Sequence, residues 1–186
     1  DSKIVVAGGQ ESMSLAPHSV HLRDGKKLGD VEITDTLIKD GLWDAFHGYH
    51  MGVTAENVAE KFQVTREEQD KFALRSQEKA IKAQKEDKFK DEIINFKIKS
   101  KKAEIIFNTD EHPREGVNLD TLSRLKPVFK NEGTVTAGNA SGINDGAAAV
   151  TLMSDDEANK RGIKKLVSIR SWASCGVDPA LMGTGP

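Results

Sequence analysis

Two strand-like segments near opposite ends of the 186-residue chain constrain its fold more than any other feature. Residues 3–7 form a short apolar run closed by Gly8 and Gly9, and residues 147–153 form a second run of the same type. Unbroken apolar runs of this length are typical of strands buried on both faces, and such strands need neighbours in a sheet. We therefore expect the two ends of the chain to contribute to one domain.

The segment after the second run continues the pattern. Ser154 and Glu157 predict a capping box that opens a short helix, and Gly162 ends that helix. Residues 166–172 follow as a third apolar strand. Because strand, helix and strand alternate, the fold class expected for the ends is α/β.

The residues between about 14 and 138 differ from the ends, since they are more charged and alternate short helices with hairpins. This contrast is typical of an inserted domain. Asp24–Gly25 predicts the tight turn of a protruding hairpin. The alternation of apolar and polar residues over 94–107 predicts a second hairpin around the basic turn 99–102.

The insertion also carries three predicted helices. The first opens at Thr54, and the second begins with a capping box of Thr65 and Glu68. The third covers residues 119–125 and ends before Pro127. On the second helix, spacings of four and three predict a narrow packing face of Phe72, Ser76, Ala80 and Ala83. An i, i+4 spacing predicts an exposed ion pair between Glu78 and Lys82.

Charge and cysteine content exclude several functional classes. The chain has 27 Lys and Arg residues against 29 Asp and Glu, a net charge of -2, so we expect neither nucleic acid nor a membrane as a partner. The single cysteine, Cys175, permits no intramolecular disulfide and no Cys-rich metal site, and it is interpreted as a small packing residue. We assign no metal, and we expect an intracellular protein.

The densest chemical signal is residues 134–149, where almost every side chain is small. Such a segment lets the backbone approach a ligand closely, with the Ser141 hydroxyl beside it. Tight packing of a crossover against its neighbours explains the same composition equally well. The glycine spacing fits no phosphate-binding loop.

Two further positions are candidates for binding. His50 and Met51 stand between glycines just before a helix and could line an acyl pocket, although a surface His beside a core Met is the alternative. Arg114 lies in a loop where a guanidinium can stack on a planar ring or pair with phosphate. A surface ion pair with Glu111 or Glu115 is the alternative for Arg114.

Three motifs, in order, resemble the thiolase family: residues 5–14, residues 48–52 with 54–59, and residues 138–149. The similarity extends over the whole chain. The His-Met pair before Thr-Ala-Glu-Asn is similar to the biosynthetic, short-chain branch, the acetyl-CoA acetyltransferases, more than to the degradative branch.

The resemblance implies a thiolase-like layered α/β fold, present in part, with an inserted α+β loop domain. Residues 1–14 and 143–163 would be parts of the N-terminal thiolase half, and residues 164–186 the start of the C-terminal half. Residues 15–142 would be the loop domain, which in the family binds coenzyme A and carries the hairpin through which tetramers meet. That hairpin would be the Asp24–Gly25 turn.

The resemblance also implies the roles of the candidate site residues. The pantetheine arm would face the small-residue segment, the acyl group would lie near the His-Met pair, and the nucleotide end would lie at the arginine. The residues are Ala140, Ser141 and Gly142 for pantetheine, His50 and Met51 for the thioester, Arg114 for adenine, and Leu42 and Phe129 as apolar contacts.

The implied reaction is the reversible Claisen condensation of two acetyl-CoA molecules to acetoacetyl-CoA and CoA through a Cys acyl-enzyme. The family's catalytic Cys, His and Asn motifs match nothing in the chain, and Cys175 aligns with none of them, so no catalytic residue is assigned. CoA is substrate and product, and no cofactor is expected. We expect a homotetramer in the cytoplasm, or in the mitochondrial matrix.

Two alternatives remain: a non-catalytic thiolase-like CoA-binding module and a degradative 3-ketoacyl-CoA thiolase. For the chain by itself we expect poor stability. The strands at 3–7 and 166–172 would lose the sheet neighbours that cover them in the complete fold, which would leave open edges and exposed apolar surface.

Overall fold

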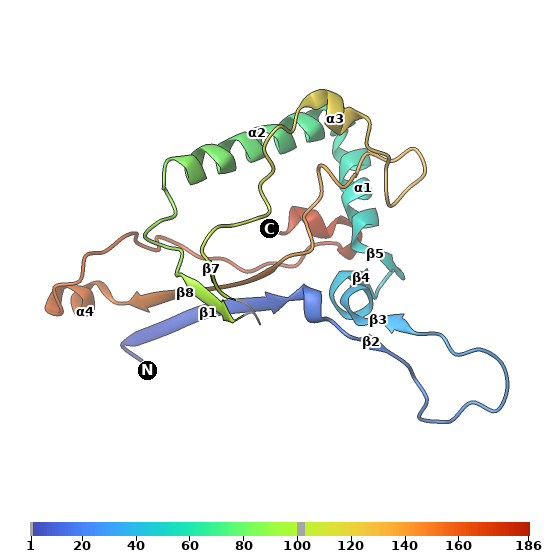
Figure 1. Cartoon of the computed structure of the whole chain (residues 1–186), viewed down its shortest axis with the longest axis horizontal. Helices are drawn as coiled ribbons and strands as arrows, with labels where there is room; N and C mark the ends of the chain where they lie inside the picture. The colour runs from blue at the N-terminus through green and yellow to red at the C-terminus, as the bar shows by residue number, and fades with distance from the viewer. Residues whose placement is uncertain (1, 100–102) are drawn as a thin grey trace. The chain divides into compact units, whose positions relative to one another are not determined.

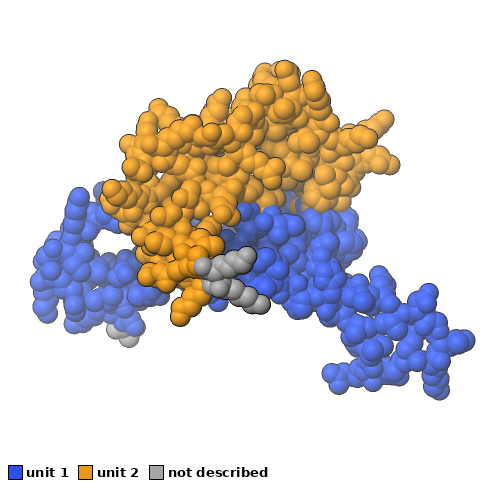
Figure 2. Space-filling view, in the orientation of Figure 1, with its two compact units in different colours: residues 1–51, 143–186 blue, residues 52–142 orange. Residues whose placement is uncertain are grey.

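The computed structural model describes residues 2–99 and 103–186. The chain divides into two compact units, one of residues 1–51 with 143–186 and one of residues 52–142 (Figure 2). The domain boundaries that the resemblance implies remain a prediction.

The first unit is built on a long antiparallel ladder between the two ends of the chain (Figure 1). Strand β1 (Ile4–Ser12) pairs with β8 (Asp145–Met153), and the register runs from Ile4 opposite Met153 to Ser12 opposite Asp145. The predicted meeting of the two ends is therefore confirmed. The predicted burial on both faces is wrong, because the ladder has two strands and Val6 is 71% exposed.

The predicted third strand, residues 166–172, is also wrong. These residues run between α4 (Asp155–Lys160) and a 3₁₀ segment, η3 (Pro179–Thr184), without pairing to any strand in the described part of the chain. Trp172 is 88% exposed. A strand exists only where a neighbouring backbone accepts and donates its hydrogen bonds, and this chain offers none at that place.

Local signals around α4 are partly confirmed. Ser154 accepts the backbone N–H of Glu157, and Gly162 ends the helix in the left-handed region at φ +64°. The Glu157 carboxylate does not close the capping box, because it pairs with Arg161 one turn later. Cys175 is exposed, so its interpretation as a packing residue is wrong in this chain.

Short elements complete the first unit, and the predicted protrusion lies among them. Gly25 adopts φ +72° and its N–H bonds the Leu22 carbonyl at 3.0 Å, so the turn is present. Strand pairing begins only at residues 18–19 and 34–35, away from the turn, so residues 20–33 form a long loop (Figure 1). The elements are η1 (Met13–Leu15), β2 (His18–Ser19) paired with β3 (Thr34–Asp35), a π-helical turn η2 (Leu37–Leu42), and β4 (Trp43–Asp44) paired with β5 (Tyr49–His50).

Three helices and a hairpin form the second unit. Helix α1 (Met51–Phe62) begins at the unit boundary, three residues before the predicted start, and α2 (Arg66–Lys85) and α3 (Leu119–Ser123) follow the prediction closely. The capping box of α2 is confirmed. The predicted hairpin is β6 (Phe96–Lys99) paired with β7 (Glu104–Phe107); residues 100–102 of its predicted basic turn lie outside the described residues.

The predicted packing face of α2 is wrong at Phe72 and Ser76, which are exposed, whereas Ala80 and Ala83 are half-buried. Phe72 is 65% exposed, whereas Asp70, which a hydrophobic pattern leaves outside, is only 4% exposed. The predicted Glu78–Lys82 pair is not formed in the described structure, since the Lys82 ammonium lies 3.8 Å from Glu86 instead. The helix is thus placed by polar contacts with distant segments, which spacing within the helix cannot reveal.

Little apolar surface is buried in either unit. The buried apolar side chains among the described residues are Ala59, Leu122, Val135 and Ala158. The accessible surface is 15843 Å², whereas a folded monomer of this mass exposes about 8,800 Å². Within the described residues, no helix is both long enough and apolar enough to cross a membrane.

Candidate functional site

A buried carboxylate fixes the start of the small-residue segment in the second unit. Glu56 of α1 is 3% exposed and accepts the backbone N–H groups of Thr134 and Val135 at 2.8–2.9 Å. The Thr134 hydroxyl donates a further hydrogen bond to it at 2.9 Å. Several donors converging on one carboxylate compensate for its burial, and they tie the segment to the helix.

The face of α1 that carries Glu56 otherwise bears small residues. Gly52, Glu56 and Ala59 follow the i, i+4, i+7 spacing and so share one stripe of the helix. A Cβ on Gly52 would lie 2.3 Å from the Phe129 ring, and a Cβ on Gly133 would lie 2.3 Å from the Glu56 carboxylate. The missing side chains are what allow residues 129–135 to approach the helix.

A second polar cluster fixes the middle of the segment on α2. The Asn139 amide donates to Asp70 and to the Thr134 carbonyl, both at 3.0 Å, and its oxygen accepts the Thr136 N–H at 2.8 Å. Asp70 also accepts from Arg66 at 2.8 Å, and Arg66 donates to the Leu122 carbonyl. Asn139 is thereby linked to α2 directly through Asp70, and to α3 through Asp70 and Arg66.

The segment packs tightly up to Asn139 and is exposed beyond it. Thr136 is completely buried, and a Cβ on Gly138 would lie 2.5 Å from Leu122 and 2.6 Å from Leu125. Ala140, Ser141 and Gly142 are exposed. Close packing therefore explains the small side chains at residues 133–139, whereas residues 140–142 are presented on a fixed base. Their predicted contact with a ligand stays a prediction.

The His-Met pair lies in the first unit, where β5 leads into α1. The turn before it is shaped by Gly48, whose φ is +75° and whose N–H bonds the Asp44 carbonyl at 2.8 Å. His47 lies 2.7 Å from the Asp44 carboxylate and stacks on Tyr49 with ring centroids 5.4 Å apart. His50 and Met51 are half-buried, and so is Leu42 at the end of η2.

The carboxyl of Asp44 shows how polar this turn is. Partial burial raises its pKa, but hydrogen bonds from His47 and from the backbone N–H groups of Phe46 and His47 outweigh burial and hold the pKa below its ordinary value. Asp44 is therefore a charged anchor for the turn that leads to His50.

Arg114 lies in an irregular segment beside α2 in the second unit. Its side chain is exposed, and its backbone N–H donates to the Gln77 side-chain oxygen at 3.0 Å. Among the described residues Arg114 forms an ion pair with neither Glu111 nor Glu115, so the predicted surface pair is wrong; Glu115 pairs with Lys85 at 2.7 Å. The structure thus leaves the guanidinium at the surface.

The predicted site residues fall in both units. Leu42, His50 and Met51 belong to the first unit, and Arg114, Phe129 and residues 140–142 belong to the second. The phenyl ring of Phe129 lies against Gly52, the residue that follows Met51 in the chain. Sets of three or more His, Cys, Asp or Glu side chains suited to a metal ion do not occur among the described residues.

Sequence reasoning missed the buried polar residues that hold the segment, namely Glu56, Asp70 and Asn139. A signal existed for Glu56, since a carboxylate stands on a stripe of small residues in α1. Asp70 and Asn139 carry no comparable signal, because their partnership joins residues that are distant in sequence.

Comparison with protein-family models matches residues 1–156 to the thiolase N-terminal domain. The chain belongs to the thiolase family. The acetyl-CoA acetyltransferase of Rhizobium meliloti is 61% identical to it over 186 residues, which is all of this chain and 47% of the relative. The thiolase chain spans about half the length of the curated relatives it matches.

Solved structures agree with this assignment. The structure of the Bacillus anthracis acetyl-CoA acetyltransferase superposes with a TM-score of 0.93 at 45% identity, covering 100% of this chain and 47% of that one. Human mitochondrial 3-ketoacyl-CoA thiolase in complex with CoA superposes with a TM-score of 0.88 at 44% identity, covering 99% and 46%. The predicted thiolase-like α/β fold, present in part, is thereby confirmed.

Proposed function

We propose that the full-length protein is an acetyl-CoA acetyltransferase and that this chain supplies its CoA- and substrate-binding part. The observation that carries the proposal is the 61% identity, over the whole chain, to an enzyme of that name. The reaction is the reversible condensation of two acetyl-CoA molecules to acetoacetyl-CoA and CoA through a Cys acyl-enzyme. We expect the chain alone to be inactive, because none of its residues is assigned as nucleophile, general base or oxyanion donor.

The exposed residues after Asn139 support a role in holding pantetheine. Ala140, Ser141 and Gly142 present a backbone with almost no side-chain bulk, and Asn139 anchors the segment immediately before them. A narrow amide-containing arm can approach such a surface and hydrogen-bond to the Ser141 hydroxyl and to the backbone. The fixed base lowers the entropy cost of binding, since the segment is ordered in advance.

The remaining candidate residues suit the two ends of the same ligand. His50 and Met51 offer a ring N–H and a polarisable thioether to a short acyl thioester, and Leu42 and Phe129 offer apolar contact. The Arg114 guanidinium, exposed at the surface, suits the adenine ring or the phosphates of the nucleotide. No cofactor is needed, since CoA is itself substrate and product.

We also propose a homotetrameric assembly in the cytoplasm, with the mitochondrial matrix as the alternative compartment. The long loop around the Asp24–Gly25 turn supports assembly, because it exposes apolar side chains that a partner subunit can cover. These side chains are Leu22, Leu28, Val31 and Ile33, of which Leu28 is 91% exposed.

The second candidate is a degradative thiolase with a longer acyl range, which the similarity to human 3-ketoacyl-CoA thiolase supports. Assays of the full-length protein with acetoacetyl-CoA and with longer 3-ketoacyl-CoA thioesters decide between the two. Thiolysis confined to acetoacetyl-CoA supports the proposal, comparable rates with long chains support the alternative, and no thiolysis of either overturns both.

A matched pair of variants tests the pantetheine role. Ser141→Phe places a bulky ring on the small-residue surface, and we expect it to raise the KM for acetoacetyl-CoA strongly. Ser76→Phe makes the same change at an exposed serine of α2 and serves as the control. Equal KM values for the two variants would contradict the role of Ser141.

A further inference from the structure

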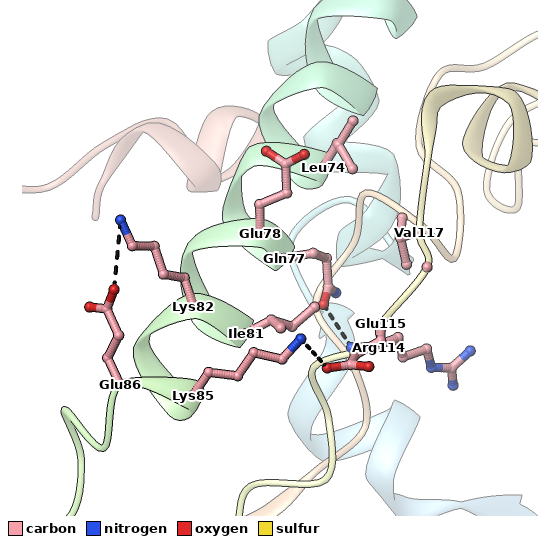
Figure 3. A pocket seen from close by; sticks show the side chains of 11 residues that line it. Leu74, Gln77, Glu78, Ile81, Lys82, Lys85, Glu86, Arg114, Glu115 and Val117 are labelled. Atoms are coloured by element: carbon pink, nitrogen blue, oxygen red, sulfur yellow. Dashed lines mark hydrogen bonds and ion pairs between the residues drawn. The ribbon is translucent and has the colours of Figure 1, made fainter.

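One face of α2 is bonded to the irregular segment that carries Arg114 (Figure 3). The segment, residues 108–117, contains no helix and no strand, so hydrogen bonds within secondary structure do not fix its course. Three polar side chains of α2 reach the segment. Two of them, Gln77 and Lys85, also line a groove of about 570 Å³ between α2 and residues 114–117. Their placement is what sets the position of Arg114.

The contacts follow the geometry of the helix. Gln77, Gln84 and Lys85 are spaced at i, i+7 and i+8, so they lie on one stripe, two turns apart. The Gln84 side-chain amide donates to the Asp110 carbonyl at 2.8 Å, and Lys85 pairs with Glu115 at 2.7 Å.

Gln77 acts on Arg114 itself. Its side-chain oxygen accepts the Arg114 backbone N–H at 3.0 Å, the one hydrogen bond in this set made to the arginine. In Figure 3 the Arg114 side chain extends away from α2 while Gln77 points toward the Arg114 backbone. The helix that provides Gln77 is 20 residues long and begins with a complete capping box, so it is a stable support.

We propose that Gln77 is a positioning residue that sets the Arg114 guanidinium for the nucleotide end of CoA. This inference rests on the proposed function. Gln77 touches no ligand itself; it fixes the backbone from which the arginine extends. Loss of its hydrogen bond lets the segment move and weakens binding of the nucleotide, while the reacting thioester is held by other residues. The effect must therefore depend on whether the substrate has a nucleotide.

The experiment uses the full-length enzyme with two substrates, acetoacetyl-CoA and acetoacetyl-pantetheine, the second of which lacks the nucleotide. Gln77→Met keeps the size of the side chain and removes the strong acceptor. One neutral hydrogen bond contributes little net free energy, so we expect the KM for acetoacetyl-CoA to rise about three- to tenfold. The kcat with either substrate and the KM for acetoacetyl-pantetheine should not change.

Three further variants make the result decisive. Glu78→Met places the same side chain at the next position of α2, where the structure shows no side-chain hydrogen bond or ion pair among the described residues, and it should behave as wild type although it also removes a surface charge. Arg114→Ala should raise the KM for acetoacetyl-CoA selectively. Because Gln77 acts through Arg114, the double variant should be no worse than Arg114→Ala alone.

The outcomes separate this inference from the proposed function. Three results would overturn the inference alone. The first is an equal rise in KM for both substrates in Gln77→Met, and the second is additive effects in the double variant. The third is a selective effect of Arg114→Ala while Gln77→Met behaves as wild type. An Arg114→Ala variant without any selective effect would overturn the inference together with the role of Arg114. Absence of thiolysis in the wild-type enzyme would overturn the proposed function itself.

Discussion

Glu56→Gln is the substitution that most sharply tests how the small-residue segment is held. Glu56 is 3% exposed and every contact made to it comes from a donor: two backbone N–H groups, of Thr134 and Val135, and the Thr134 hydroxyl. A glutamine keeps one acceptor oxygen but replaces the other with an amino group that faces a donor. The charge that strengthens the remaining bonds is lost as well.

The expected magnitude follows from these contacts. A hydrogen bond to a charged group contributes about 1.5–3 kcal/mol, and one between neutral groups about 1 kcal/mol. Losing one charged bond and weakening two others therefore costs about 3 kcal/mol. Since each 1.4 kcal/mol is a factor of ten in an equilibrium constant, local opening of the segment should become about 100-fold more frequent.

Hydrogen exchange of the full-length protein measures this opening. In Glu56→Gln the amides of Thr134 and Val135 should exchange about 100-fold faster than in wild type. Glu60→Gln, one turn later on α1, removes an exposed carboxylate that pairs with Lys130, and it should leave those amides unchanged. Wild-type exchange rates in Glu56→Gln would show that the Glu56 carboxylate does not hold the segment.

Three further predictions concern packing, pH and exposed surface. Gly138→Ala should destabilise the protein by about 1–3 kcal/mol in urea unfolding, because its methyl group would lie 2.5 Å from Leu122 and 2.6 Å from Leu125; an unchanged midpoint would contradict the packing. Hydrogen bonds from the side chain and backbone of Ser14 lower the pKa of Asp145, so this contact stabilises the fold above the ordinary aspartate pKa, and its contribution is lost as the pH falls through the lowered value. Asp145→Asn should therefore reduce stability near neutral pH and flatten the acid limb of a stability profile; an unaltered profile would remove Asp145 from the account. The isolated 186-residue chain should bind a hydrophobic dye and self-associate, as its exposed apolar surface predicts; a monomeric, non-binding chain in sedimentation analysis would contradict this.

Local signals in the sequence predicted the elements that depend on local chemistry. The capping box of Thr65 and Glu68 begins α2 because its partners are three residues apart, so the signal and the structure lie in the same segment. The apolar runs at residues 3–7 and 147–153 predicted only that the two ends belong together; the antiparallel register of β1 and β8 was not predicted. Only the capping box requires no knowledge of distant contacts.

Elements that depend on distant partners were predicted less well. The inward face of α2 is set by Asp70, whose partner Asn139 lies 69 positions away. Hydrophobic spacing cannot reveal this contact, and it predicted the exposed Phe72 as the buried residue instead. Residues 166–172 have the composition of a strand but no neighbour in this chain to pair with. Apolar pattern predicts a tendency to form a strand, whereas pairing decides whether the strand exists.

For the candidate site as well, some features could be predicted from the sequence and others depend on distant partners. Composition favoured packing and ligand binding equally for residues 134–149, and the structure assigns packing to residues 133–139, where a Cβ on Gly133 or Gly138 would clash. The residues that hold the segment, Glu56 and Asp70, were not predicted, because nothing in the sequence reveals which backbone groups they meet. The ligand contacts of Ser141 and His50 come from the family resemblance, and they remain predictions.

The decisive measurement is a structure of the full-length protein with bound CoA. The pantetheine arm should lie along residues 140–142, within hydrogen-bonding distance of the Ser141 hydroxyl, with its sulfur end near His50 and Met51 and its nucleotide near Arg114. Pantetheine bound away from both Ser141 and His50 would show that neither residue holds the substrate.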